Sequence, residues 1–268
     1  MNDNSESICD KTHLLELTGT YNLLLENFKA AQDCYEKLVS RNQENSSYIE
    51  HLILSKQISN PKDIQNEYYF WKIKYPKSRT IRILLLKFLQ GPLFEKEIYE
   101  YLKTCIQKGI ISSSKELKFI YLDKDKTRIL QSTLIKMVSS LKFFNSFEGK
   151  NKSKEPKSSF VWCHFFLASH LDKIGKHDKA LDIINTVIGT GEDDIDLMVL
   201  KAKILKHKNE PQLAMSVMIE AQKLDQDDKC LASKCVKYMI RADSIDEALR
   251  LHKMCGKRSN RLVYSSPG

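Results

Sequence analysis

The sequence predicts an all-α fold in which pairs of helices recur along the chain. Three apolar helical patterns near the C-terminal end carry an alanine at the same place, and Ala180, Ala214 and Ala248 follow one another at intervals of 34 residues. Thirty-four residues is the tetratricopeptide period, and a small residue is needed where two antiparallel helices approach closely. Few stretches alternate as strands do, and 268 residues include only 9 Gly and 6 Pro. We therefore expect a tetratricopeptide-like helical-hairpin superhelix, an α-solenoid.

Residues 1–60 predict N-terminal tetratricopeptide-like hairpins. The stretch LTGTYNLLLENFKAAQDCYEKLVSRNQEN follows the same pattern as the later repeats. The positions in register are Gly19, Ala31, Tyr35 and Leu38. The next helix, SYIEHLILSK, is expected to begin at a capping box formed by Ser47 and Glu50, in which each side chain bonds the other residue's backbone.

The middle of the chain, 61–145, predicts irregular helical repeats. Its first helical pattern breaks at Pro76, and FEKEIYEYLKTCIQKG and DKTRILQSTLIKMVSSLKFF follow as amphipathic helices. The segment 146–159 is rich in Lys and Ser and lacks apolar spacing, which predicts an exposed loop between the two halves. A nucleic-acid-binding arm is the less favoured alternative for this loop.

Residues 160–256 predict three tetratricopeptide hairpins, and 257–268 a disordered tail. Pro211 suits the first turn of a helix, and the pair Ser244 and Glu247 reads as a capping box. The other positions that match the repeat are Leu167, Ala168, Leu171, Gly175, Val187, Ala221 and Cys255.

Composition favours a cytoplasmic protein and leaves polyanionic partners open. The net charge is +9, from 43 Lys and Arg against 34 Asp and Glu, although lysines that merely solvate helices would give the same balance. The seven cysteines form no CxxC pair, which favours small buried side chains in a reducing compartment. No apolar run reaches the roughly 18 residues of a membrane-spanning helix, so no membrane partner is expected.

The stretch KAKILKHKNE concentrates cations on one predicted first helix. With Ala214 and Ala248 at position 20 of their repeats, position 9 is lysine twice, and this position points into the concave groove of such repeats. Helical spacing adds two further cations to the same faces. The predicted anion-binding or acidic-partner residues are Lys203, Lys206, Lys237 and Arg241.

A solvated face is the competing interpretation of these cations. Like charges about 10 Å apart repel by only about 0.4 kcal/mol in water, so surface lysines can tolerate one another. If the cations instead form an anion site, Lys201 and Lys234 would be its peripheral members, and Lys208 would face solvent. Part of the charge could be neutralised by Asp225, Asp227 and Asp228, or these acids could serve helix N-termini. No residues are spaced to read base edges, so DNA is not an expected partner.

The sequence carries no recognised catalytic motif. GxGxxG, GxxxxGK[ST], GxSxG and HExxH are all missing from it. His164 and His170 have no acids or cysteines arranged around them for a metal or base role. The aromatic residues expected in the core rather than as stacking platforms are Trp71, Trp162, Phe143 and Phe144. We expect no enzyme, no catalytic residue and no bound metal.

Three stretches point to a family. WCHFFLASHLDKIGKHDKALDIINTVI, LMVLKAKILKHKNE and DKCLASKCVKYMIRADSIDEAL closely resemble the auxiliary subunit of the N-terminal acetyltransferase A complex, and the resemblance spans about residues 9–255. It implies a non-catalytic scaffold that wraps a separate catalytic subunit and positions it at the ribosome for co-translational acetylation. It also implies inositol hexakisphosphate at the subunit interface, with Lys203, Lys206, Lys237 and Arg241 as its expected contacts, and no covalently bound cofactor.

The sequence also departs from that family. Its members are much longer, the motif Thr-Pro-Thr is replaced by GTGEDD, and GKRSNRLVYSSPG stands where the chain should continue. We therefore expect a truncated form or fragment. The alternative function is a tetratricopeptide adaptor that binds the acidic peptide tails of a chaperone or another partner in the same groove.

Overall fold

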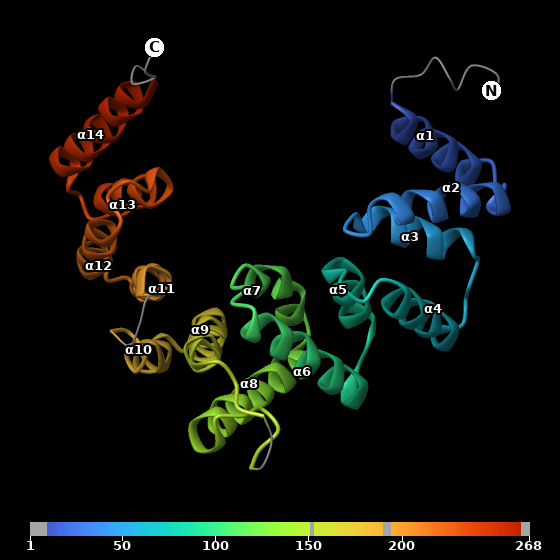
Figure 1. Cartoon of the computed structure of the whole chain (residues 1–268), viewed down its shortest axis with the longest axis horizontal. Helices are drawn as coiled ribbons and strands as arrows, with labels where there is room; N and C mark the ends of the chain where they lie inside the picture. Colours follow the sequence, from blue (N-terminus) through green and yellow to red (C-terminus); the bar gives the residue numbers. More distant parts are fainter. Residues whose placement is uncertain (1–9, 151–152, 190–193, 264–268) are drawn as a thin grey trace. The chain divides into compact units, whose positions relative to one another are not determined.

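The computed structural model describes residues 10–150, 153–189 and 194–263, with the side chains from Cys255 onward left undescribed. The described residues form helices without a β-strand, as the sequence predicts, in a tetratricopeptide-like helical solenoid (Figure 1). The chain divides into two compact units. Unit 1 holds Met1–Leu102 and Glu116–Lys126, and unit 2 holds Lys103–Lys115 and Thr127–Gly268.

Unit 1 contains five complete helices, the start of α6 and a short 3₁₀ helix. Its elements are α1 (Lys11–Leu24), α2 (Phe28–Arg41), α3 (Ser46–Ser55), α4 (Pro61–Lys74), α5 (Arg79–Phe88), the beginning of α6 (Gly91–Gln107) and η1 (Leu117–Leu122). Helices α1 and α2 form an antiparallel hairpin against which α3 packs.

The N-terminal hairpin has the predicted register. Gly19 is buried, and a Cβ atom there would lie 3.1 Å from the Tyr35 ring, so the two helices touch at this point. Ala31 and Leu38 are fully buried on the facing side. The start of α3 was predicted wrongly, because Asn45 is the N-cap and its side chain accepts from the Ser47 N–H at 3.0 Å.

Helices α4 and α5 are separated around Pro76, as expected. Both ends of α5 are closed by distant side chains. The Glu44 carboxylate accepts from the backbone N–H groups of Arg79 (3.1 Å) and Thr80 (3.0 Å) at its N-terminus. At its C-terminus the buried Lys126 ammonium donates to two backbone carbonyl oxygens of the last turn.

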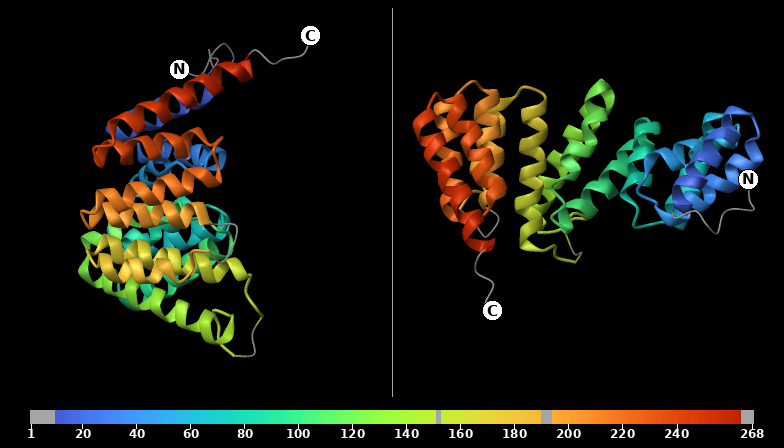
Figure 2. Two further views of the ribbon diagram at one scale, coloured as in Figure 1. Left: turned by 90° about the vertical axis from the view of Figure 1, so that its left-hand side faces the viewer. Right: turned by 90° about the horizontal axis from the view of Figure 1, so that it is seen from above.

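Among the described residues, unit 2 contains the rest of α6 and all or most of eight further helices. They are α7 (Ser113–Glu116), α8 (Lys124–Phe144), α9 (Lys157–Lys173), α10 (His177–Asn185), α11 (Asp194–His207), α12 (Pro211–Leu224), α13 (Lys229–Arg241) and α14 (Ile245–Val263). From α9 to α14 the helices lie side by side with alternating direction (Figure 2).

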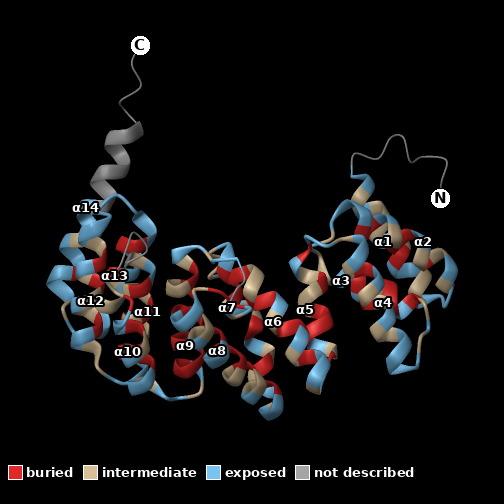
Figure 3. Ribbon diagram, turned by 60° about the horizontal axis from the view of Figure 1, so that its bottom comes forward, coloured by how far each residue is buried: buried red, intermediate tan, exposed pale blue. Residues whose placement is uncertain are grey.

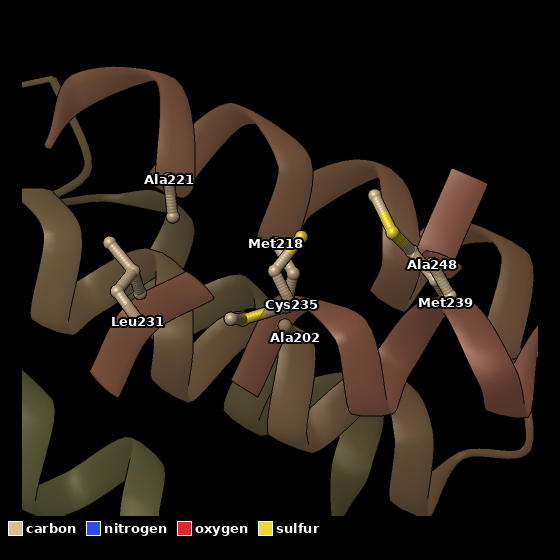
Figure 4. Packing of buried hydrophobic residues seen from close by; sticks show 7 residues of the cluster. All are labelled: Ala202, Met218, Ala221, Leu231, Cys235, Met239 and Ala248. Atoms are coloured by element: carbon tan, nitrogen blue, oxygen red, sulfur yellow. The ribbon is translucent and has the colours of Figure 1, made fainter. Parts of the chain in front are cut away.

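The three C-terminal hairpins form where the alanine spacing places them. Ala180, Ala214 and Ala248 are buried, and Ala214 and Ala248 lie in the second helices α12 and α14. Figure 3 shows buried residues on the faces that meet neighbouring helices and exposed residues on the outer faces. In Figure 4, Met218 and Cys235 meet beside Ala202, so side chains of α11, α12 and α13 share one core cluster.

Smaller details of these hairpins also follow the sequence. Val187 and Ala221 are fully buried, whereas the side chain of Cys255 lies outside the described residues. Pro211 is the first residue of α12. The pair predicted as a capping box makes a different contact, since the Ser244 hydroxyl donates to the Glu247 carboxylate at 3.0 Å, side chain to side chain, beside the first turn of α14.

The segment 146–159 is less of a loop than predicted. Phe147 is buried, and α9 begins at Lys157. Glu148 accepts from Lys103 Nζ at 2.6 Å, and Glu155 accepts from Gln107 Nε2 at 2.8 Å, so side chains of α6 hold the segment. Apolar spacing alone did not reveal these attachments, because they are made by polar side chains.

Two further expectations need correction. Trp71 and Trp162 are buried as predicted, but Phe143 and Phe144 are 74% and 46% exposed at the end of α8, so neither is a core residue. The predicted tail over 257–268 is helical as far as Val263, the end of α14, and 264–268 lie outside the described residues.

Candidate anion site

The predicted cations of unit 2 are arranged around one buried carboxylate. Asp172 lies in the last turn of α9, the first helix of its hairpin, and its side chain is completely buried. Helix α9 packs against α11, the first helix of the next hairpin. A charged group without solvent is stable only when opposite charges or hydrogen-bond donors surround it. The sequence supplies two such partners, Lys203 and His207, one repeat later, and a third, His177, at the start of α10.

Three basic groups contact the Asp172 carboxylate. His207 Nδ1 lies 2.8 Å from one carboxylate oxygen and 2.9 Å from the other. His177 Nδ1, at the start of α10, lies 3.2 Å from the carboxylate, and Lys203 Nζ lies 3.6 Å from it. A carboxylate can only accept, so each imidazole donates from Nδ1. Two histidines and one lysine therefore share one negative charge.

Lys203 has an unusual environment for a surface lysine. Its side chain is 36% exposed, and burial lowers its pKa. The neighbouring ammonium groups of Lys173 and Lys206 lower that pKa further, whereas the Asp172 carboxylate opposes both effects. Positive charge is thus crowded around Lys203, and an added anion would relieve the crowding.

Helix α13 extends the same cationic surface. Burial raises the pKa of Tyr238, and the Asp172 carboxylate raises it further while Arg241 lowers it. The Arg241 guanidinium lies 5.7 Å from the centre of the Tyr238 ring and is exposed. One surface thus carries charges from the first helices of three successive hairpins. We call it the first-helix face, and it comprises Asp172, Lys173, Lys203, Lys206, His207, Tyr238 and Arg241.

The four predicted site residues differ in how closely they approach the groups around Asp172. Lys203, Lys206 and Arg241 interact with the groups around Asp172, either directly or through Tyr238. Lys237 is exposed on α13, next to Tyr238 in sequence. Their joint role in binding an anion stays a prediction.

The acids proposed to neutralise the lysines have other partners. Asp228 caps α13 and accepts from the backbone N–H groups of Cys230 and Leu231. Asp225 accepts from the backbone of the two residues after Gln226. These acids serve the helix junction, and Asp172 is the neutralising carboxylate that the sequence reading missed.

Lys208 also departs from the expectation of a purely solvated side chain. It is exposed, but its ammonium group pairs with Asp178 at 2.9 Å and Glu210 at 2.8 Å. Its hydrogen bonds to these carboxylates raise its pKa. Lys208 therefore lies outside the first-helix face.

The contact between Asp172 and His207 could have been predicted from their spacing in the sequence. The residue stands 35 positions before His207, which is one repeat plus one residue. Residues one repeat apart lie on adjacent first helices, so an acid in this place can meet a base in the next hairpin. Recognising the pair required knowing that α9 packs directly against α11.

His164 and His170 belong to the core instead. His164 Nδ1 lies 2.7 Å from the carbonyl oxygen of Phe160 within α9, and burial lowers the pKa of His164. Burial lowers the pKa of His170 to about 4. Both imidazoles are neutral near pH 7 and pack inside the hairpin.

A cavity of about 310 Å³ in unit 1 has a different character. Arg79 lines it and lies 3.5 Å from Glu116, and Glu44 is held by the N-terminus of α5. Its lining carries two acids, Glu44 and Glu116, and two bases, Arg79 and Lys87, so positive charge is not in excess there. The first-helix face is therefore the stronger candidate for an anion.

Comparison with known proteins identifies the family. The family described as "N-terminal acetyltransferase A, auxiliary subunit" matches residues 1–261. The chain belongs to this family. The resemblance inferred from its repeat motifs is confirmed.

Individual relatives agree with this membership. Human N-alpha-acetyltransferase 16, NatA auxiliary subunit, is 36% identical over 255 residues, which are 94% of this chain and 29% of the human protein. The Arabidopsis thaliana N-terminal acetyltransferase A complex auxiliary subunit NAA15 is 28% identical over 296 residues, covering 97% of this chain and 33% of that protein. This member of the family thus spans about three tenths of the length of these relatives.

A solved structure shares the fold. The structure of Naa15/Naa10 bound to HypK-THB contains a chain that superposes with a TM-score of 0.81 at 25% identity, covering 93% of this NatA auxiliary-family chain and 36% of the other. The relatives are auxiliary subunits by name, in agreement with the prediction that the chain is not itself the acetyltransferase. Within the described ranges, none of the helices combines the length and apolarity needed to span a membrane.

Proposed function

We propose that this chain is a non-catalytic scaffold that holds the catalytic subunit of an N-terminal acetyltransferase complex. The observation that carries the proposal is the 0.81 TM-score to a chain of the Naa15/Naa10 structure, together with membership in the auxiliary family. Stacked hairpins offer a long surface for binding another protein. The residues that transfer acetyl would then lie on the partner chain.

A pull-down of the tagged chain, followed by mass spectrometry, tests this role. The proposal expects an acetyltransferase of the Naa10 type among the captured proteins in near-stoichiometric amount. Capture of chaperones with acidic tails, without an acetyltransferase, would instead support the adaptor function. That alternative draws on the exposed cations Lys237 and Arg241 of α13.

We further propose that the complex works in the cytoplasm at the ribosome, on nascent chains. The net charge of +9 supports this, since the ribosome surface is rich in phosphate. Co-sedimentation of the chain with ribosomes should weaken as salt increases, because exposed charges are screened within about 10 Å at 0.1 M salt. A chain that stays in the ribosome-free fraction at low salt would contradict this part of the proposal.

The first-helix face is proposed to bind a compact polyanion such as inositol hexakisphosphate. Support comes from the basic side chains that surround Asp172, which far outnumber its single negative charge. Phosphate groups pair well with guanidinium and ammonium groups that are already crowded together. The ligand would add negative charge where the fold has concentrated positive charge.

Titration calorimetry with inositol hexakisphosphate tests the site. Lys206→Glu/Arg241→Glu should weaken binding at least about tenfold, because two cations of the first-helix face become anions. Lys229→Glu/Lys253→Glu is a matched control, since both lysines are exposed and the change in net charge is the same. Equal affinity of the two variants would rule the face out as the binding site.

A further inference from the structure

Two histidines contact the same carboxylate as Lys203, and the polyanion binding proposed so far does not depend on the charge of either imidazole. His177 and His207 come from different hairpins, yet both donate to Asp172. Their ring centres lie 6.2 Å apart. Two imidazoles this close to one buried acid form a cluster that can gain or lose charge.

The cluster lies between the interior and the solvent. The Asp172 side chain is completely buried, whereas those of His177 and His207 are 25% and 32% exposed. Each imidazole uses Nδ1 for the carboxylate, so protonation takes place at Nε2. A proton there adds a positive charge and creates a new N–H donor, without breaking the bond to Asp172.

The surrounding charges are mostly positive. The titratable or charged groups nearby are Lys173 of α9, Lys176 before α10, Asp178 of α10, Lys203, Lys206 and Lys208 of α11, Glu210 before α12, and Tyr238 and Arg241 of α13. Asp178 and Glu210 both pair with Lys208. Among the residues that the structure describes, Asp172 is the acid recorded in contact with the two imidazoles.

We propose that polyanion binding at the first-helix face is coupled to proton uptake by His177 and His207. This inference rests on the proposed polyanion site, and it adds that pH regulates binding there. In the unoccupied face, lysines and Arg241 crowd together and their like charges repel. A bound polyanion removes that repulsion, and Asp172 together with the ligand then holds an additional proton on the imidazoles.

Linkage fixes the sign of the effect. If the ligand favours the protonated imidazoles, protons favour the ligand to the same extent. An imidazole normally changes charge between pH 5 and 8. The face should therefore bind polyanions more tightly at about pH 6 than at about pH 8.

The test uses an anion whose own charge is constant. Phosphate esters have a second pKa near 6, so inositol hexakisphosphate itself changes charge in this range. Inositol hexakissulfate keeps its charge, and any pH dependence of its binding reports on the protein. Titration calorimetry on the whole chain should give a Kd about tenfold lower at about pH 6 than at about pH 8. Parallel titrations in two buffers of different ionisation enthalpy should show net proton uptake.

His177→Gln/His207→Gln removes the titrating groups and keeps amide donors that can reach Asp172. This variant should bind with the same affinity at both pH values, whereas His252→Gln, at an exposed position of α14, should behave as the unmodified chain. Circular dichroism checks that each variant folds, and the single variants replace the double one if it does not. Each should then lose part of the pH dependence.

The outcomes separate the two proposals. Equal affinity of the unmodified chain at both pH values overturns proton coupling and leaves the polyanion site intact. Persistence of the pH dependence in His177→Gln/His207→Gln overturns it as well. If neither the hexakissulfate nor the hexakisphosphate binds at either pH, the polyanion site and its coupling both fail.

Discussion

Among individual residues, Asp172 has the largest influence on the candidate site. Its buried carboxylate receives hydrogen bonds from His177 and His207 and pairs with Lys203. Burying a carboxylate is costly unless its partners are well placed, and removing one member of such a group leaves the others without compensation. The residue therefore contributes to folding and to the arrangement of the cations around it.

Replacing Asp172 with asparagine should lower the free energy of unfolding by about 2 kcal/mol near pH 7. This is less than the 3–5 kcal/mol typical of broken buried pairs, because the basic partners are about a third exposed. Urea denaturation measures the change. Asp178→Asn is the matched control: its side chain is 81% exposed and pairs only at the surface, so a loss of less than about 0.5 kcal/mol is expected. Equal losses in the two variants would show that the Asp172 cluster adds nothing to stability.

His170 should make the stability of the chain depend on pH. Its buried imidazole has a pKa of about 4, against an ordinary value near 6.5, so the unfolded chain binds a proton between these values that the folded chain does not. The free energy of unfolding should be highest above about pH 6.5 and fall by about 2–3 kcal/mol as the pH approaches 4. His170→Leu should flatten this decline in denaturation curves recorded across the range. An unchanged decline would place its cause in other groups.

Between helices, the 34-residue spacing determines where close contacts occur. Ala214 is fully buried in α12, and its hairpin partner α11 contributes Ala202 to the neighbouring core. Small residues at these points let the helices approach closely, as Gly19 does beside Tyr35 in unit 1. Packed interiors of this kind leave little room for added atoms.

Ala214→Leu should therefore destabilise unit 2 by about 1–3 kcal/mol, because the added atoms force the helices apart. The measurement is thermal or urea unfolding followed by circular dichroism. Ser216→Leu, at an exposed position of the same helix, should change stability by less than about 0.5 kcal/mol. If both substitutions cost the same, the close contact inferred at Ala214 does not exist.

The helices and their register were predictable because local patterns determine them. The alanine period, the break at Pro76 and the start of α12 at Pro211 depend on nearby residues, and each appears where expected. The start of α3 was misplaced because Asn45 and Ser47 are both good N-caps only two residues apart. To decide which of the two residues is the N-cap, one must know the backbone path of the residues that precede α3.

Long-range relations were harder to infer. Phe143 was expected in the core, yet it is exposed at the end of α8, since no helix of the described residues covers it. The Asp172–His207 pair joins residues 35 positions apart, and it becomes visible only when α9 is known to pack on α11. The sequence therefore predicted the cations of the candidate site but missed the acid that contacts three basic side chains.

For the molecule as a whole, the fold and the family support the same proposed function. A helical tetratricopeptide-like chain related to auxiliary subunits supplies binding surface, and its basic charge favours polyanionic partners. A polyanion bound by the cations around Asp172 would also stabilise unit 2 against unfolding. A catalytic subunit bound to this scaffold would supply the chemistry.

Co-expression with a catalytic subunit of the Naa10 type tests the scaffold function most directly. The two chains should co-purify through gel filtration, and the pair should transfer acetyl to a peptide with an N-terminal serine, while this chain alone shows no turnover. Failure of the catalytic subunit to co-purify, or acetyl transfer by this chain on its own, would contradict the proposed function.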